Sequence, residues 1–258
     1  MLLLFVACAK PPQAPAAMEE LASWFFREWP SEDPGALESA AQQLYDCAEK
    51  VDPGAEDPLD RAWVVGPLSR ADVEGLVDHD NDPANGFGVG EIFASQHGIE
   101  DHMRVIEMPD QTPVEPASPE RFQRTFIDGD PDCLRSGECE TMRSHNDVHR
   151  KTALYEIEYE IEKEWRYVDV LDEDGQPVDQ ALCARSWNLD EAQHKAITLK
   201  QGYALDVFLP RDQGSLRMHL TWQETEIPGL DDEDMQGALV NGIEDLLTHQ
   251  DAWMAENL

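Results

Sequence analysis

The chain has 258 residues, of which 41% are hydrophobic, and it carries 19 Lys and Arg against 54 Asp and Glu, a formal net charge of −35. This hydrophobic content is enough for a sizeable core and excludes wholesale disorder. The excess of carboxylates excludes nucleic acid as a partner, because phosphate binding requires clustered cations, and it disfavours direct adsorption to anionic lipid head groups. No stretch reaches the ~20 apolar residues that span a bilayer, so we expect membrane association only through a covalent lipid anchor.

The chain opens with "MLLLFVACAK", an apolar run that ends in the small residue Ala7 before Cys8. "LFVAC" resembles the lipobox of bacterial lipoproteins, in which the cysteine is lipidated and becomes the new N-terminus. The resemblance implies that residues 1–8 are the remnant of an export signal and that Cys8 carries the lipid. It places the protein in the cell envelope, at the periplasmic face of the outer membrane or at the cell surface, because Ala9 rather than Asp follows the cysteine.

Residues 9–17, "AKPPQAPAA", contain three prolines and show no apolar periodicity. Proline favours extended geometry, so we interpret this stretch as a Pro-rich spacer between the anchor and a folded part. The alternative is a terminus whose apolar residues pack on that folded part. We expect residues 18–258 to form a single domain.

The first part of this domain, residues 18–50, predicts a helical hairpin. Apolar residues recur at helical spacing on both sides of Pro30, which ends the first helix, and Ser31 can cap the second. A loop rich in Pro, Gly and acids follows. "LSRADVEGLVDHD" then opens with Ser69 and Asp72 at the spacing of a capping box, which predicts a short helix.

The segments "GEIFASQ", "HMRVIEM" and "RFQRTFI" are apolar enough to predict short strands. The clearest pattern is "LYEIEYEIEKEWRYVDV", where five glutamates alternate with Tyr, Ile and Trp, and Lys163 interrupts the apolar side. This period of two predicts a long, half-buried strand over residues 153–170 with the glutamates outward. Such a ladder of carboxylates requires water or cations from adjacent strands, and Arg185 and Arg217 are the candidates.

A turn in "DEDGQP" and three further strand patterns lead to a closing helix that begins in "DDED". The predicted fold class is therefore α+β: N-terminal helices, an antiparallel meander sheet, and a long C-terminal helix packed on the sheet. The element order of residues 85–258, sheet plus closing helix, resembles the helix-grip (START-like) proteins. That resemblance implies a small apolar ligand held between the sheet and the last helix.

Two acidic stretches raise the question of a metal site. In "DHDNDPANGFGVGE", Asp78, Asp80 and Asp82 match the opening of a calcium loop. The pattern then fails, because Pro83 replaces the required Gly and Val89 replaces the final Glu. "DGDPD" gives a similar triplet.

The stretch "CLRSGECETMRSHNDVH" contains two thiols and two imidazoles, those of Cys133, Cys139, His145 and His149. Two cysteines and two histidines are a ligand set that binds zinc in other proteins. The spacing matches no zinc finger. In an exported chain a disulfide persists, and we predict that Cys133 and Cys139 form one. Zinc ligation, or pairing with Cys47 and Cys183, remains as an alternative.

No motif of a known enzyme class is present: G-x-S-x-G, H-E-x-x-H, the P-loop and G-x-G-x-x-G are all missing. We interpret His219, on the polar face of a strand, as a surface residue. We therefore expect an acidic, non-catalytic cell-envelope lipoprotein without a cofactor, which binds a small apolar ligand or another envelope protein. The alternatives are a metal-dependent hydrolase that uses the Asp or Cys/His clusters, and a purely structural surface protein.

Overall fold

A computed structural model describes residues 13–31, 33–48, 50–53, 55, 57–116, 119–151, 156–171, 175–194, 197–227 and 232–258. Cys8 and the rest of the predicted signal remnant lie outside these residues. The described helices are α1 (Met18–Glu28), α2 (Pro34–Ala48), α3 (Ile99–Glu107), α4 (Pro131–Ser136) and α5 (Asp232–Asn257), with the 3₁₀ helices η1 (Pro58–Arg61), η2 (Pro83–Asn85) and η3 (Thr112–Val114). The described strands are β1 (Ala62–Val65), β2 (Phe87–Ser95), β3 (Pro119–Asp128), β4 (Met142–Lys151), β5 (Glu156–Leu171), β6 (Pro177–Asn188), β7 (Ala192–His194), β8 (Ile197–Pro210) and β9 (Ser215–Glu226).

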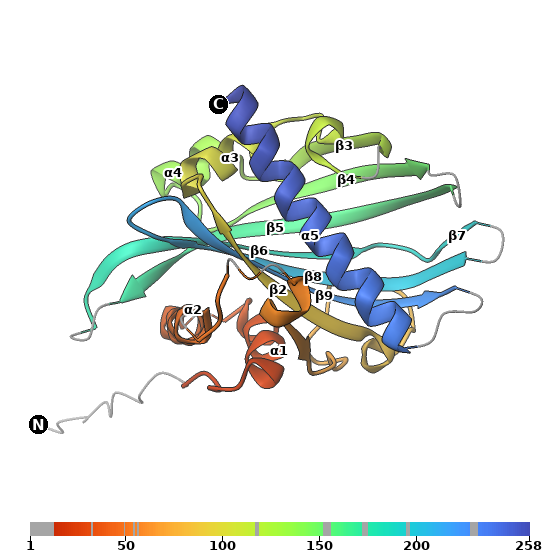
Figure 1. Ribbon diagram of the computed structural model, residues 1–258, viewed down its shortest axis with the longest axis horizontal. Coiled ribbons are helices and arrows are strands. Elements are labelled where there is room, and N and C mark those ends of the chain that lie inside the picture. Colours follow the sequence, from red (N-terminus) through yellow and green to blue (C-terminus); the bar gives the residue numbers. More distant parts are fainter. Residues whose placement is uncertain are drawn as a thin grey trace, which may run out of the picture.

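The strands form one sheet in the order β1-β2-β9-β8-β6-β5-β4-β3, with β7 added to β8, and the pairings are antiparallel. The helices α1 and α2 lie against one face of the sheet, and α5 crosses the other (Figure 1). The α+β prediction is therefore confirmed. We call the first side the hairpin face, which bears Leu205, Val207, Leu220 and Trp222, and the second the α5 face, which bears Asp206, Phe208, Arg217 and His219.

The hairpin face carries the largest apolar core. Helix α1 presents apolar residues at helical spacing, and they pack between α2 and the alternate residues of β8 and β9. The ring of Phe26 is fully buried and meets Tyr203 and Trp222 edge-on, with ring centroids 6.1 and 5.8 Å apart. The indole N–H of Trp222 donates to the carbonyl of Gly66 at 2.8 Å, so its one polar atom is satisfied.

Packing on this face begins before α1. Ala14 is buried in the same core, and its N–H donates to Ser39 Oγ at 3.0 Å. The folded chain therefore includes the last residues of the predicted spacer and starts before Met18.

The long glutamate strand is confirmed as β5, which pairs with β4 on one side and β6 on the other. Glu158 and Glu160 are exposed. Arg185 pairs with Glu164, its Nη2 lying 2.9 Å from Oε2, as predicted. The other proposed cation, Arg217, was wrongly assigned because it lies on the α5 face.

Three other predictions were wrong or incomplete. "HMRVIEM" is not a strand but belongs to α3, because Met103, Val105 and Ile106 bury one side of a helix whose first turn is acidic. "LSRADVEGLVDHD" forms turns without a helix, although Asp72 accepts the Ser69 N–H at 2.6 Å as in a cap. Gly75 there has a φ of +78°, which a helix does not allow. Strand β4 was not predicted.

Candidate functional site

A cavity of about 480 Å³ lies between α5 and the sheet. Its volume falls within the ~300–1,000 Å³ of small-molecule sites. The apolar part of its lining comes from α5, from β5 and from the ends of β8, and includes Ile157, Ile161, Leu199, Leu239, Ile243 and Leu246. The space is therefore bounded by hydrocarbon along much of its length.

Helix α5 is held over the cavity by two apolar contacts. Val240 and Leu247 pack with Val89 of β2, while Met254 packs with Val105 and Val114 near the end of the helix. These contacts fix one edge and the C-terminal end of α5. The cavity-lining residues Leu239 and Ile243 belong to the first of these contacts, and the cavity-lining Gln250 accepts a hydrogen bond from Arg217 of β9.

A buried ionic contact adds to this attachment. Arg61 Nη2 lies 2.5 Å from Glu244 Oε2 of α5 and 3.2 Å from Glu91 Oε1 of β2. Burial and the neighbouring Glu244 together raise the pKa of Glu91 to about 8, and Arg61 partly opposes them. Glu91 is therefore protonated in the folded protein at neutral pH. Arg61, Glu244 and the protonated Glu91 together carry no net charge.

The sheet side of the cavity contains a cluster of charges around Asp206. Lys163 Nζ lies 2.5 Å from Asp206 Oδ2, while His219 Nδ1 and Arg217 Nη2 lie 2.8 and 3.3 Å from Oδ1. Burial alone would raise the pKa of Asp206, but Lys163, His219 and Arg217 hold it well below its ordinary value. Burial lowers the pKa of Lys163, and Asp206 opposes that change.

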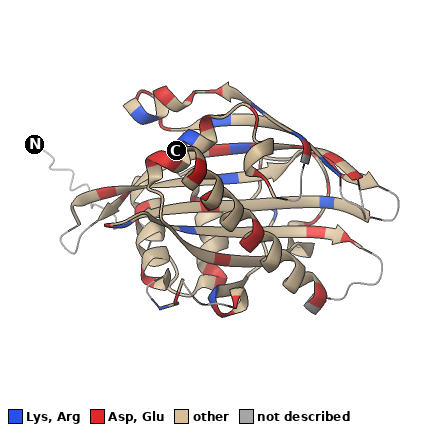
Figure 2. Cartoon of the chain, turned by 45° about the horizontal axis from the view of Figure 1, so that its top comes forward, with Lys and Arg blue, Asp and Glu red and all other residues tan. Residues whose placement is uncertain are grey.

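A second set of charged residues comes from the outer strands. Arg124 on β3 donates from Nε to Asn146 Oδ1 at 2.8 Å and from Nη1 to the carbonyl of Ile106 at 2.7 Å. Burial lowers the pKa of Arg124 to about 10, so it stays charged at neutral pH. Arg150 on β4 pairs with Glu115, its Nη2 lying 2.7 Å from Oε2. Figure 2 shows basic positions within the strands of the sheet.

The imidazoles at the cavity have different roles. His102 is neutral because burial lowers its pKa to about 3, and its Nε2 lies 3.0 Å from Ser215 Oγ. His219 is not a surface residue as predicted: it faces the cavity and contacts Asp206. Within the described residues, no Ser, Thr or Cys is hydrogen-bonded to His219, so the acid–histidine pair has no adjacent nucleophile.

The structure does not bring the predicted metal ligands together. Asp82 accepts the Ala84 N–H at 3.2 Å as the cap of η2. Across the described part of the chain, no group of three or more His, Cys, Asp or Glu side chains is placed to hold a metal ion. Asp78 and Asp80 are therefore not joined to Asp82 in such a group.

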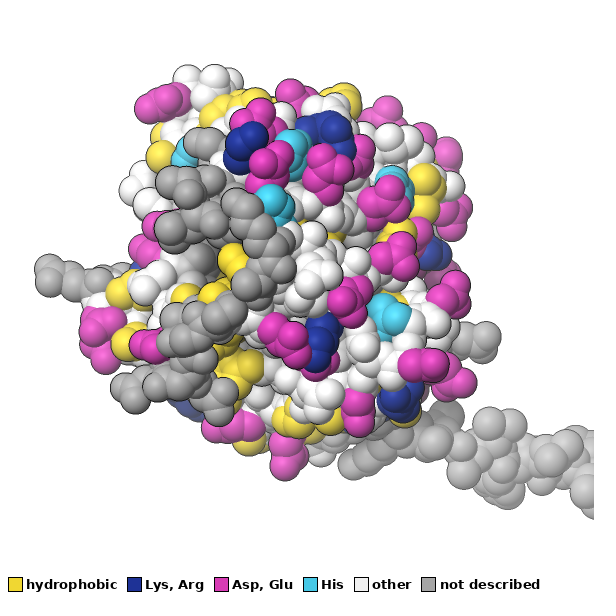
Figure 3. All heavy atoms as spheres, turned by 90° about the vertical axis from the view of Figure 1, so that its right-hand side faces the viewer, with side chains coloured by type: hydrophobic (Ala, Val, Ile, Leu, Met, Phe, Trp, Pro, Cys, Tyr) yellow, Lys and Arg dark blue, Asp and Glu magenta, His cyan; other side chains and the backbone are white. Residues whose placement is uncertain are grey.

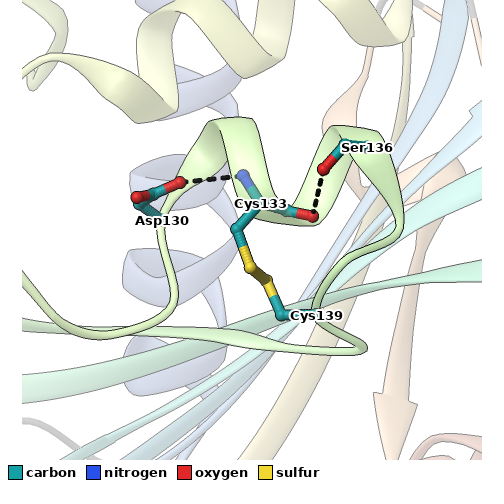
Figure 4. The surroundings of a disulfide bond; sticks show 4 residues. All are labelled: Asp130, Cys133, Ser136 and Cys139. Carbon is teal, nitrogen blue, oxygen red and sulfur yellow. Dashed lines mark hydrogen bonds between the residues drawn. A yellow bond between two sulfur atoms is a disulfide. The ribbon is translucent and has the colours of Figure 1, made fainter.

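Cys133 and Cys139 form a disulfide, as predicted (Figure 4). The bridge closes the end of α4, whose N-terminus is capped by Asp130, which accepts the Cys133 N–H at 2.8 Å. Cys47 and Cys183 are buried free thiols, so the alternative pairings were wrong. The two histidines of the zinc alternative approach carboxylates of β5 instead: His145 lies 3.8 Å from Glu160 and His149 lies 3.1 Å from Glu156.

No family model and no curated protein matches the chain. Solved structures with a similar arrangement include a START superfamily protein from Mycobacterium smegmatis, which is 8% identical, with a TM-score of 0.44 over 66% of this chain and 99% of its own. A STAR-related lipid transfer protein from Xanthomonas axonopodis is 9% identical, with a TM-score of 0.42 over 65% and 85%. A protein from Thermus thermophilus is 16% identical, with a TM-score of 0.43 over 66% and 97%. START-like proteins are thus among the structural neighbours, in line with the resemblance in element order.

The TM-scores lie below 0.5, so the function has to be inferred from the cavity of this chain. The described helices include none that is both long and apolar enough to span a membrane. Sequence reasoning missed Arg124, Lys163 and Asp206 as cavity residues. Two of them carried a signal: Lys163 interrupts the apolar side of β5, and Asp206 lies between apolar residues in "YALDVFLP".

Proposed function

We propose that the protein binds a small, largely apolar ligand without chemical change, in the cavity between α5 and the sheet. The observation that carries this proposal is the cavity itself. Protein interiors are close-packed, and few voids exceed the size of a water molecule. A space of about 480 Å³ with apolar walls and a few charged groups on one side is what a ligand site requires.

The proposal is tested with N-phenyl-1-naphthylamine, a neutral apolar dye whose fluorescence rises on leaving water. Gly242 on α5 lines the cavity, and a Cβ added there meets no atom within 4 Å. Gly237 is a matched control on the same helix, because an added Cβ also meets nothing there and the residue is not part of the lining.

We expect the unaltered protein and Gly237→Phe to bind the dye equally, and Gly242→Phe to bind it at least tenfold more weakly, because the ring occupies the cavity. Circular dichroism verifies that both variants fold. Failure of the unaltered protein to bind the dye, or equal binding by the two variants, would contradict the proposal.

We also propose that the protein is a lipid-anchored protein of the cell envelope. Two observations support this: the resemblance of "LFVAC" to a lipobox, and the Cys133–Cys139 disulfide, a bond that persists in oxidising compartments. The acidic surface does not itself attract anionic lipid, and acidic side chains are spread over the face in Figure 3.

The location is tested by labelling expressing cells with radioactive palmitate. The full-length protein is expected to take up label and to partition into the membrane fraction, and Cys8→Ser is expected to do neither. Unlabelled protein, or label that persists in Cys8→Ser, would refute the anchor.

A further inference from the structure

We infer that the ligand of this cavity is an amphiphilic acid, an apolar chain that ends in a carboxylate, and that the carboxylate binds to Arg124. This inference deepens the proposed function and rests on it. It begins with the charge of the cavity, which is opposite in sign to that of the chain.

The protein as a whole has a net charge of −35, yet the charged residues that line the cavity are mostly cations. The cations are Arg124, Arg150, Lys163 and Arg217, and the carboxylates are Glu115 and Asp206. Leaving the histidines aside, this is an excess of two positive charges. Buried charges are costly unless they are paired, so an excess of one sign inside a cavity favours a ligand of the other sign.

The excess positive charge of the cavity is not distributed equally over its four cations. Arg150 is neutralised by Glu115, while Lys163 and Arg217 share Asp206. Arg124 has no carboxylate within ion-pair distance among the described residues. Both of its hydrogen bonds go to neutral oxygens, and within the same residues its Nη2 makes none.

The side chain of Arg124 is held in place although it has no carboxylate partner. The residue is 9% exposed, and its guanidinium lies over the ring of Trp165, 5.0 Å from the centroid. The two hydrogen bonds and the ring fix the guanidinium, so little conformational entropy is lost when an anion binds. A planar guanidinium with free N–H groups matches a carboxylate in geometry and charge.

The rest of the lining determines what the carboxylate is attached to. Ile157 and Ile161 project from β5, and Leu239 and Leu246 from α5, into the same cavity. Hydrocarbon against these side chains gains roughly 0.8 kcal/mol for each buried CH₂. A charged head at Arg124 and an apolar chain under α5 therefore satisfy both parts of the lining.

The test compares dodecanoate with dodecanamide and dodecylamine as competitors of N-phenyl-1-naphthylamine at pH 8. The acid and the amide have the same chain and nearly the same shape and differ in charge. We expect the Kd of dodecanoate to be at least tenfold lower than that of dodecanamide, and dodecylamine to be the weakest of the three because its cation meets the excess of cations.

Arg124→Gln removes the charge and is expected to raise the Kd of dodecanoate at least tenfold, to the level of the amide, without changing that of the amide. Arg104→Gln is the control, because Arg104 is exposed on α3 and does not line the cavity. Equal displacement by acid and amide, or an unchanged preference for the acid in Arg124→Gln, would overturn the inference.

Those outcomes leave the proposed function standing, because the dye is still bound and displaced. Failure of the unaltered protein to bind the dye would instead contradict the proposed function. The comparison of acid and amide on the unaltered protein does not require any variant to fold.

Discussion

The two faces of the sheet are built from alternate residues of the same strands, yet they differ in packing and in charge. On the hairpin face, Leu205, Val207 and Leu220 are fully buried in a continuous apolar core. Between them on the α5 face stand Asp206 and His219, which border a cavity. The alternation that in most antiparallel sheets separates core from water here separates core from a lined cavity, because a second layer covers the polar face.

The two faces therefore have different roles in the molecule. The hairpin face gains stability from the burial of a continuous apolar core. The α5 face gives up packing and holds paired charges, which contribute little net stability and in return define a site. Substitutions on the two faces are therefore expected to differ in their effect on stability.

Phe26→Ala on the hairpin face is expected to lower the free energy of unfolding by about 3–5 kcal/mol, because it removes a fully buried ring and leaves a void against Trp222. Leu239→Ala on α5 is expected to cost less than about 1 kcal/mol, because Leu239 is half-buried beside an existing cavity. Urea unfolding followed by tryptophan fluorescence measures both. Similar losses would mean that the two faces do not differ in packing.

Asp206→Asn tests whether the charges of the α5 face are balanced by this one carboxylate. We expect a loss of about 3 kcal/mol at neutral pH, because Lys163 and Arg217 are left buried without their common anion. Since the pKa of Asp206 in the folded protein lies below its ordinary value of 3.8, its contribution is complete above that value and is lost as the pH falls through the folded pKa.

The gap in stability between Asp206→Asn and the unaltered protein is therefore expected to be fully present at about pH 4 and to narrow in stronger acid. Unfolding midpoints measured from about pH 4 downward check the sign. A gap that does not narrow in this range would show that Asp206 is not held ionised by its neighbours.

The sequence predicted the α+β class, the helical hairpin and β5, because each depends on a periodicity that a window of residues displays. It did not predict the site, because periodicity assigns a residue to a face but does not say what covers that face. Asp206 and His219 satisfy the pattern of a strand with a wet outer side, and only the packing of α5 makes them cavity residues. Arg217 was assigned to the wrong face for the same reason.

The strand prediction for the segment that forms α3 was wrong for a different reason. Its seven letters satisfy a strand and a helix almost equally, and the contacts of Met103 and Ile106 with distant elements decide between them. Arg124 had no local signal, because its importance depends on the absence of a carboxylate among neighbours that come from β4, β5 and α3.

Glu91→Gln tests the attachment of α5 to the sheet. The folded pKa of Glu91, about 8, lies above its ordinary value of 4.5, so the stability linked to its proton is complete below 4.5 and is lost as the pH rises through 8. Glutamine keeps the neutral state at every pH. We expect the variant to gain about 3–4 kcal/mol on the unaltered protein between pH 5 and pH 9, or about 6–16 °C in Tm.

The comparison between pH values removes any constant effect of the substitution on the contact with Arg61. Differential scanning calorimetry at several pH values provides the measurement. A difference in Tm that stays the same from pH 5 to pH 9 would show that Glu91 does not carry a proton at neutral pH in the folded state.

The smallest effect is expected where the hairpin face continues along β5 into water. Glu158 and Glu160 are exposed there, and they stand about 6.8 Å apart, which in water corresponds to a repulsion of about 0.6 kcal/mol before screening by salt. Glu160→Gln is therefore expected to change the free energy of unfolding by less than about 0.5 kcal/mol.

Glu162→Gln, on the same side of the same strand, is expected to cost more, because Glu162 accepts a hydrogen bond from Arg143 Nε at 2.7 Å. If instead Glu160→Gln costs more than Glu162→Gln, the contact of His145 with Glu160, at 3.8 Å, contributes more to stability than the exposure of that carboxylate implies.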